Sequence, residues 1–242
     1  MTKSKTIAQE LAEKTIQELA RHKQPVSRSR VWKSPQAYRY LVQWSNAVLL
    51  RYFIKLFTAS LPKAEYRRKA QVDDAARSVV RNIEEGWKRA NTSDYLNFVG
   101  YSQGSLEEVK GDIRELTEDG LLKSVRGSNL KGIGIDLGEF NQTLKPGGYV
   151  KDIKGQSEEK LEENKTFGFD YIPLTVLYSP LKNIRPEDLT YEIFMELINK
   201  TDWLLRKLVE SLEKKLAEEQ RGYQVEKARI RSNLKNQDYG SL

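Results

Sequence analysis

The chain has 242 residues, of which 31% are charged and 38% apolar, and its formal net charge is +7. That length is sufficient for one large or two small domains with a sizeable core. The chain has no cysteine and a single histidine, His22, which excludes disulfides, thiolate metal sites, cysteine nucleophiles, Ser-His-Asp triads and Glu-x-x-His metal sites. No apolar run is long enough to span a membrane and the N-terminus has no apolar signal core, so we expect a cytoplasmic protein without membrane contact.

Positive charge is unevenly distributed along the chain. Residues 1–62 carry 11 Lys and Arg against 3 Asp and Glu, and residues 221–242 carry 5 against 2, whereas residues 92–122 carry 2 against 7. A basic surface on a soluble protein is typical of nucleic-acid binding, in which phosphates supply most of the affinity. A solvated surface without a specific partner has the same composition, so charge alone leaves both interpretations open.

Residues 1–33 are predicted to form an N-terminal helix and a basic linker. The helix covers residues 6–21, and its apolar positions are Ile7, Leu11, Ile16 and Leu19. Because it is short, we expect it to dock on the rest of the protein or on another subunit. In the linker, Arg28, Arg30 and Lys33 are candidate phosphate contacts, although a linker kept soluble by charge has the same composition.

The first long helix is predicted from Pro35 to Leu61, with Ser34 as its N-cap and Pro62 as its stop. Its main apolar stripe consists of Leu41, Trp44, Val48, Tyr52 and Leu56. Further apolar residues crowd its second half, namely Leu49, Leu50, Phe53, Ile54 and Phe57. A helix that is apolar over so much of its circumference must be covered on more than one side, so we infer that self-association covers the rest.

The second helix, predicted over residues 63–90, is apolar on one side and basic on the other. Its apolar stripe, at steps of three and four, is Val72, Ala76, Val79, Ile83 and Trp87. At about 100° per residue, Arg77, Arg81 and Lys88 lie on the opposite side. The candidate phosphate contacts of this helix are these three residues together with Arg67, Arg68 and Arg89. We expect Trp87 to be packed rather than stacked on a base.

The third helix is predicted from Ser93, its N-cap, to about Gly120. Its apolar residues alternate steps of four and three, a heptad pattern typical of helices that pack at a shallow angle. This seam consists of Tyr95, Val99, Ser102, Leu106, Val109, Ile113 and Leu116. Gly100, Gly104 and Gly111 lie off the seam, where we expect them to let a neighbouring backbone come close. Short connections make the three helices of residues 34–122 antiparallel neighbours.

Residues 123–189 are rich in glycine and proline, and we interpret them as an insertion before the last helix. The run from Tyr171 to Tyr178 is its only strand-like segment, so we expect an irregular insertion with a small β element. The pairs Gly132-x-Gly134 and Gly147-Gly148 do not predict a phosphate-binding loop, because neither a Lys-Ser/Thr pair nor a strand-turn-helix context follows them.

The last long helix is predicted over residues 190–220. Its apolar stripe is Ile193, Leu197, Thr201, Leu204, Leu208, Leu212 and Leu216. Residues 221–242 are predicted to be a basic tail, in which a helical continuation would fray. Lys227, Arg229 and Arg231 are the candidate phosphate contacts of this tail.

A pattern in the second and third helices resembles a known family. It is Gln71-x3-Ala75-Ala76-x-Ser78-x3-Asn82-Ile83-x-Glu85-Gly86, followed by Gly104-Ser105-Leu106-x-Glu108. Upstream, Leu41-x2-Trp44, Tyr52, Pro62 and Glu65 fit the same family. Over roughly residues 41–122, the chain resembles the four-helix-bundle proteins encoded in 23S ribosomal RNA intervening sequences. That family includes the accessory variability determinant of diversity-generating retroelements. The chain departs from it at Lys110, where the family tends to have a carboxylate, and in the long insertion.

The resemblance implies an all-α, antiparallel up-down four-helix bundle, to which this chain adds an N-terminal helix, an irregular insertion before the last helix and a basic C-terminal tail. It also implies a homo-oligomer, commonly a pentamer, that binds RNA and has no enzymatic activity and no cofactor. In the retroelement branch such a protein binds the reverse transcriptase and its template RNA and supports mutagenic cDNA synthesis. Asn82, Glu85 and Gly86 match the family motif, and we expect them to fix a contact between helices.

Two other functions are consistent with the sequence. The first is a scaffold that oligomerises and binds a protein partner through the insertion and the tails. The second is a magnesium-dependent nucleotide pyrophosphohydrolase, whose carboxylates would be Glu84, Glu85, Glu107, Glu108 and Asp112. Their spacing does not reproduce the Glu-Glu-x-x-Glu/Asp pattern that places three carboxylates together, so the enzyme is the weakest of the three hypotheses.

Overall fold

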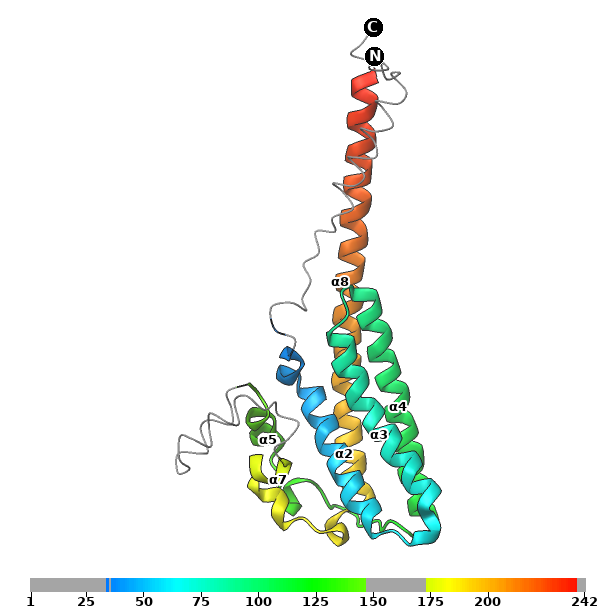
Figure 1. Cartoon of the computed structure of the whole chain (residues 1–242), viewed down its shortest axis with the longest axis vertical. Helices are drawn as coiled ribbons and strands as arrows, with labels where there is room; N and C mark the ends of the chain where they lie inside the picture. The colour runs from blue at the N-terminus through cyan, green and yellow to red at the C-terminus, as the bar shows by residue number, and fades with distance from the viewer. Residues whose placement is uncertain (1–33, 35, 147–172, 239–242) are drawn as a thin grey trace, which may run out of the picture.

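The computed structural model describes residues 34, 36–146 and 173–238, with side chains as far as residue 230. Within these ranges the regular elements are all helices, without a strand, which confirms the predicted all-α class. The long helices are α2 (Val42–Ser60), α3 (Tyr66–Trp87), α4 (Thr92–Glu118) and α8 (Tyr191–Asp238). They pack as α2 on α3, α3 on α4, α4 on the first half of α8, and α8 on α2, and we call this unit the helical body (Figure 1). None of the described helices has the length and apolarity that crossing a membrane requires.

The helix α2 starts later than predicted and buries a different face. A short 3-10 helix, η1 (Ala37–Tyr40), precedes it, and Leu41 between the two has an extended backbone with φ −81° and ψ 118°. The buried face, at most 4% exposed, contains the residues that crowd the second half, namely Leu49, Leu50, Phe53, Ile54 and Phe57. The predicted main stripe is wrong, because Val48, Tyr52 and Leu56 are only half-buried.

The insertion of the chain itself covers the wide apolar face of α2. Both α5 (Leu137–Thr143) and η7 (Pro186–Asp188) pack on α2, and Figure 1 shows α5 and α7 beside it. The hydroxyl of Tyr52 on α2 donates to the carbonyl of Leu181 at 3.5 Å. The apolar excess of α2 is therefore no argument for self-association, and that step of the sequence-based inference is wrong.

The contact between α3 and α4 agrees with the sequence. All residues of the heptad seam predicted on α4 are at most 2% exposed, which confirms that prediction. Two hydrogen bonds join the helices, one from Gln71 of the family motif and one from Ser102 of the heptad seam. Gln71 Nε2 donates to Asp112 Oδ1 at 2.8 Å, and Ser102 Oγ donates to the carbonyl of Val79 at 2.9 Å. The N-cap of α4 is Asn91 rather than the predicted Ser93, and its side chain accepts from a backbone N–H of the first turn.

The glycines of α3 and α4 differ in whether a neighbouring helix lies close to them. At Gly86 of α3, an added Cβ would lie 2.8 Å from Phe98 Cβ and 2.8 Å from a ring carbon of Tyr95, so glycine is what allows α3 and α4 to approach. No atom lies within 4 Å of the corresponding position at the three glycines off the α4 seam, Gly100, Gly104 and Gly111. Within the described part of the chain, the prediction that these three admit a neighbouring backbone is wrong.

The described parts of the insertion, residues 123–146 and 173–189, form short helices. Besides α5 and η7 they are η3 (Lys131–Ile133), α7 (Leu174–Leu177) and η6 (Ser179–Asn183). The predicted β element is wrong over residues 173–178, which contain α7, whereas residues 171 and 172 lie outside the described residues. A short apolar run does not distinguish strand from helix, and Leu174, Leu177 and Leu181 also fit a helical period.

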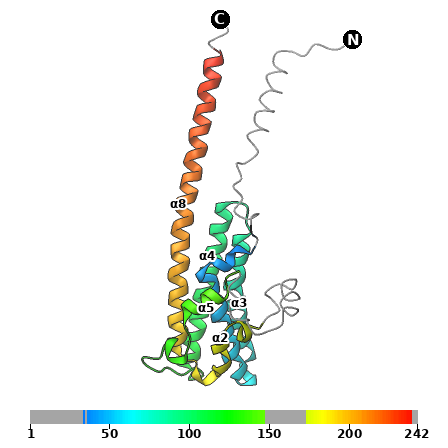
Figure 2. The ribbon, with the colours of Figure 1, turned by 90° about the vertical axis from the view of Figure 1, so that its left-hand side faces the viewer.

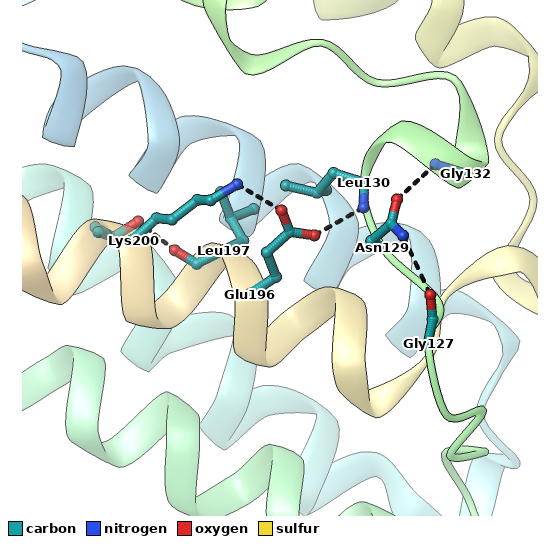
Figure 3. Close-up of polar contacts among 8 residues, drawn as sticks. Gly127, Asn129, Leu130, Gly132, Glu196, Leu197 and Lys200 are labelled. Atoms are coloured by element: carbon teal, nitrogen blue, oxygen red, sulfur yellow. Dashed lines mark hydrogen bonds and ion pairs between the residues drawn. The ribbon is translucent and has the colours of Figure 1, made fainter.

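Two glutamates near the start of α8, Glu192 and Glu196, hold the first loop of the insertion. Glu192 accepts from the backbone N–H of Val125 at 2.8 Å and from the hydroxyl of Ser124. Figure 3 shows Glu196 one turn further, where it accepts from the backbone N–H of Leu130 at 2.8 Å. The loop's backbone donors are thereby satisfied by α8, which fixes the insertion to the helical body.

The helix α8 is longer than predicted, because it continues past Gln220 to Asp238. Near the end of the helical body, Thr92 Oγ1 donates to Glu219 Oε1 at 2.8 Å. Beyond this point α8 projects past the ends of α3 and α4 (Figures 1 and 2). The basic tail is therefore part of one continuous helix as far as Asp238, and we call residues 221–238 the α8 extension.

Candidate nucleic-acid interface

Arg51 of α2 and Arg77 and Arg81 of α3 lie on two helices that pack on each other, near enough for their charges to interact. Arg51 is half-buried on α2, and Arg77 and Arg81 are exposed on α3. Burial lowers the pKa of Arg51, and the positive charges of Arg81 and Arg77 lower it further. The opposing carboxylates are those of Glu84 and Asp73. We call Arg51, Arg77 and Arg81 the arginine cluster.

The two carboxylates beside the arginine cluster are partly occupied by other groups. Glu84 accepts from Arg81 at 2.9 Å and also from Trp44 Nε1 of α2 at 3.0 Å. Asp73 accepts from the hydroxyl of Thr58 at 2.9 Å. Among the described residues, neither Arg51 nor Arg77 has a carboxylate within ion-pair distance. The two carboxylates nearest to Arg51 are thus shared with other groups.

At the C-terminal end of α3, the predicted contacts have different surroundings. Lys88 lies with its Nζ 6.0 Å from the ring centre of Tyr38, and the helical period places it on the same side of α3 as Arg77 and Arg81. Arg89 instead lies over the ring of Phe98 on α4, at 4.2 Å from its centre. Trp87 is packed edge-to-face on the ring of Tyr95 and is half-buried, as predicted, which removes it as a stacking platform for bases.

The arginines at the start of α3 are also unlike one another. Arg68 forms an ion pair at 2.7 Å with Asp119, just beyond the end of α4, and lies 3.6 Å from Glu65. Arg68 therefore joins two helices, and its contact with phosphate stays a prediction. Arg67 is exposed, and its Nε donates to the hydroxyl of Tyr66 at 3.0 Å. It lies in the first turn of α3, away from the arginine cluster.

The remaining predicted contacts are not part of this surface. Arg28, Arg30 and Lys33 lie outside the described residues. Lys227 and Arg229 belong to the α8 extension, where Arg229 lies 3.6 Å from Glu226 of the same helix. Arg231 also falls in the extension, beyond the last described side chain. The structure therefore brings together Arg77 and Arg81 with Arg51 and leaves the basic residues of α8 elsewhere.

Sequence reasoning missed Arg51. It sits in the most apolar stretch of the chain, and periodicity on α2 alone does not show which neighbour it faces. A charged side chain there was itself a signal, because arginine in a largely buried helix must reach solvent or a partner. Only the pairing of α2 with α3 shows that it lies beside Arg77 and Arg81.

The carboxylates considered for magnesium chemistry do not converge. Glu107 pairs with Lys110 of its own helix at 3.1 Å, and Glu85 faces Arg89 at 3.8 Å. Asp112 is buried between α3 and α4, where burial raises its pKa and the neighbouring Glu115 raises it further. Within the described ranges, no three carboxylate or histidine side chains gather in a way that would hold a metal ion. Because Glu85 is exposed, the helix-fixing role expected for it is also wrong.

Comparison with known proteins gives a match to the part of the chain that contains the candidate site. A protein-family model described as 23S rRNA-intervening sequence protein matches residues 39–137. No match was found among curated proteins or solved structures. The matched segment contains α2, α3 and α4, and with them Gly86, the Gln71–Asp112 hydrogen bond and the arginine cluster. Over residues 39–137, which are less than half of its length, the chain is similar to the 23S rRNA-intervening sequence proteins.

Proposed function

We propose that this protein is a non-enzymatic RNA-binding protein and that the arginine cluster contacts the phosphates. The observation that carries the proposal is the basic side of α3, where Arg77 and Arg81 are exposed and to which the neighbouring helix α2 adds Arg51. Three like charges held together repel one another, and a bound phosphate relieves that repulsion. Arginine is also suited to phosphate, because its planar guanidinium donates two parallel hydrogen bonds.

The shape of the surface favours an extended chain of phosphates over a single anion. Arg77, Arg81 and Lys88 follow one side of α3, and at 1.5 Å per residue the line from Arg77 to Lys88 is about 16 Å long. Contacts of this kind position a nucleic acid without reading its bases. We therefore expect affinity that depends on salt and little preference for sequence.

A narrower form of the proposal follows the family resemblance. In that form the chain is an antiparallel four-helix bundle that assembles into a homo-oligomer, commonly a pentamer. It serves as the accessory subunit of a diversity-generating retroelement reverse transcriptase, binds the template RNA and supports mutagenic cDNA synthesis. This form predicts that a reverse transcriptase gene lies beside the gene for this protein and that the two products copurify.

The experiment is a salt series of RNA binding measured by fluorescence anisotropy with a short single-stranded RNA. For three phosphate contacts, the logarithm of the affinity should fall against the logarithm of salt concentration with a slope of about −2. In Arg77→Glu/Arg81→Glu we expect at least ~10-fold weaker binding and a slope near zero, because two contacts are replaced by repulsion.

A matched control changes charge by the same amount elsewhere. Lys207→Glu/Lys214→Glu reverses two exposed lysines of α8 outside the arginine cluster and should bind RNA nearly as the wild type does. Equal losses in both double variants would contradict a specific phosphate site. Unchanged binding in Arg77→Glu/Arg81→Glu, or no binding by the wild type, would favour the alternative of a scaffold that binds a protein partner. Circular dichroism and subunit mass on the same samples check that each variant is folded.

A further inference from the structure

The first half of α4 presents an uncharged surface. Residues 95–106 contain no charged side chain, whereas residues 107–119 contain six Asp and Glu against two Lys and Arg. The exposed residues of the uncharged stretch are Asn97, Gly100, Tyr101 and Gly104. A single exposed tyrosine is common on protein surfaces, so its surroundings have to show whether Tyr101 has a ligand.

The ring of Tyr101 is held in place by a second ring and a cation. It packs edge-to-face on Phe98 one turn earlier, with the ring centres 5.6 Å apart, and 60% of Tyr101 remains exposed. Phe98 lies directly against α3, because the Cβ that Gly86 lacks would be 2.8 Å from Phe98 Cβ. The guanidinium carbon of Arg89 lies 4.2 Å from the centre of the Phe98 ring. We call Arg89, Phe98 and Tyr101 the aromatic platform.

The helix surface beside Tyr101 is bare. At both neighbouring glycines, Gly100 and Gly104, no atom lies within 4 Å of the position that a Cβ would occupy. Side chains on a helix lean toward its N-terminus, so Tyr101 leans onto Phe98 and away from Gly104. A flat ligand can therefore approach the ring over Gly104 without displacing a described side chain.

The aromatic platform lies at the same level of α3 as the arginine cluster. The helices α3 and α4 run side by side (Figure 1), and Ser102, next to Tyr101, donates to the carbonyl of Val79 at 2.9 Å. Because Val79 and Arg81 are only two residues apart, Tyr101 lies beside the part of α3 that carries Arg81. A helix with its side chains is about 10–12 Å wide, so a strand of a few nucleotides spans α3 from Arg81 to the platform.

We propose that the aromatic platform binds an unpaired base of the RNA, which stacks on Tyr101. This inference rests on the proposed function, because the phosphates on the basic side of α3 bring the bases to the platform. Aromatic side chains interleaved with positive charge bind single strands by stacking, and they accept any base because every base has a flat face. Arg89 supplies the positive charge, which Glu85 at 3.8 Å offsets only in part because both side chains are about half exposed.

Stacking adds a selectivity that phosphate contacts lack. The arginine cluster contacts phosphates in single strands and in duplexes alike. In a duplex the bases are already stacked on one another and paired, so none of them is available to Tyr101. The platform therefore strengthens the binding of single-stranded RNA only, and it does so without a preference among the bases.

The substitution Tyr101→Ala tests the platform on the single-stranded RNA of the salt series. We expect ~10-fold weaker binding, because one base loses its stacking partner. The salt dependence should keep the slope of the wild type, because no phosphate contact is removed, in contrast to Arg77→Glu/Arg81→Glu. Tyr101→Phe keeps the ring and should bind as the wild type does.

The matched control is Trp203→Ala, which removes an exposed aromatic ring with a cation beside it on another helix. Trp203 on α8 is 59% exposed, and Lys207 Nζ lies 6.0 Å from its ring centre. This variant should bind single-stranded RNA as the wild type does. A blunt-ended duplex of the same sequence is the second control, and the wild type and Tyr101→Ala should bind it equally.

Several results would overturn the platform. Unchanged binding in Tyr101→Ala, an equal loss in Trp203→Ala or an equal loss for the duplex would each show that no base stacks on Tyr101. A lower subunit mass in Tyr101→Ala would assign the ring to a contact between copies of the chain. Each of these results can occur while Arg77→Glu/Arg81→Glu still loses binding, which would leave the proposed function intact. A wild type that binds no RNA would overturn both.

Photo-cross-linking locates the base directly. The base analogue 5-iodouridine reacts on irradiation with an aromatic side chain that is stacked on it, and mass spectrometry identifies the modified peptide. We expect the peptide that contains Tyr101, with a yield that falls by about fivefold or more in Tyr101→Ala. A cross-link confined to other peptides, or one whose yield is unchanged in Tyr101→Ala, would contradict the stacking.

Discussion

Two helices of this protein carry more apolar surface than one neighbour buries, and they differ in what covers it. On α2, the residues that crowd its second half are all buried, and the insertion, more than 75 residues later in the chain, adds to the cover that α3 and α8 provide. On the α8 extension, Tyr223 continues the core-facing stripe and remains exposed among the described residues. An apolar excess in a sequence therefore does not identify which part of a protein covers it.

The packing on α2 also shows that this insertion belongs to the hydrophobic core and is not a surface loop. A Gly/Pro-rich segment is commonly taken for a surface loop, yet this one contributes Phe140 and Tyr178 to the core, with their rings edge-to-face at 5.4 Å. Glu192 and Glu196 fix its first loop to α8. The insertion is thus part of the hydrophobic core, and its described parts pack on α2 together with α3 and α8.

The substitution Phe140→Ala tests most directly whether the insertion stabilises the fold by covering α2. If the insertion is a structural cover, the substitution leaves a cavity beside α2 and lowers the free energy of unfolding by about 3–5 kcal/mol. Urea denaturation followed by circular dichroism measures this. Val176→Ala, at a side chain of α7 that is 53% exposed, is the control and should change stability by no more than about 0.5 kcal/mol. A small effect of Phe140→Ala would mean that the insertion is an appendage and that α2 needs another cover.

A smaller effect is expected from the loop anchor. Glu192→Ala removes the acceptor for Val125 N–H and Ser124, and should cost about 1 kcal/mol, because water replaces part of the lost bonding. Glu187→Ala, at an exposed glutamate a few residues earlier, should be nearly neutral. Similar losses in both variants would indicate a general charge effect rather than an anchor.

The loop anchor also predicts a pH dependence. Burial acts to raise the pKa of Glu192, but the hydrogen bonds from Ser124 and Val125 outweigh it and hold that pKa below the usual 4.5. A carboxyl whose pKa is lower in the folded state stabilises the fold above the unfolded value and loses that contribution as pH falls. The stability difference between the wild type and Glu192→Ala should therefore shrink as the pH falls from 7 to below 4.5. A constant difference would show that the carboxylate charge is not involved.

The sequence correctly predicted those parts of the fold that follow from the spacing of apolar residues along a single helix. The α4 seam has a strict heptad spacing, and every residue of it is buried. On α2 the apolar residues surround much of the helix, so period does not distinguish the buried side. The α7 run was too short to separate strand from helix, and Leu204 was predicted in the core where Leu205 is found. The residue at which α8 ends depends on tertiary contacts, so helix propensity alone does not predict it.

The candidate site was likewise predicted only where the spacing within one helix places its residues. The helical period placed Arg77 and Arg81 on one side of α3, and the structure agrees. Contacts with other helices decide whether an arginine is free to contact a ligand. Arg68 pairs with Asp119, and Arg89 lies over Phe98. Arg51 joins the cluster only through the pairing of α2 with α3, so no spacing within one helix indicates it.

The smallest predicted change in stability is that of Gly104→Ala. It tests whether a second copy of the chain packs on the side of α4 that this chain leaves exposed. Gly104 lies on the open side of α4, and Gly104→Ala should raise the free energy of unfolding by about 0.5–1 kcal/mol, because alanine loses less backbone entropy than glycine and meets no neighbour. Gly86→Ala, where the new Cβ would lie 2.8 Å from two aromatic side chains, should instead cost about 1–3 kcal/mol. A loss of stability in Gly104→Ala, together with a lower subunit mass, would place a second copy against α4. The cover of that face would then come from another chain, as part of the cover of α2 comes from the insertion.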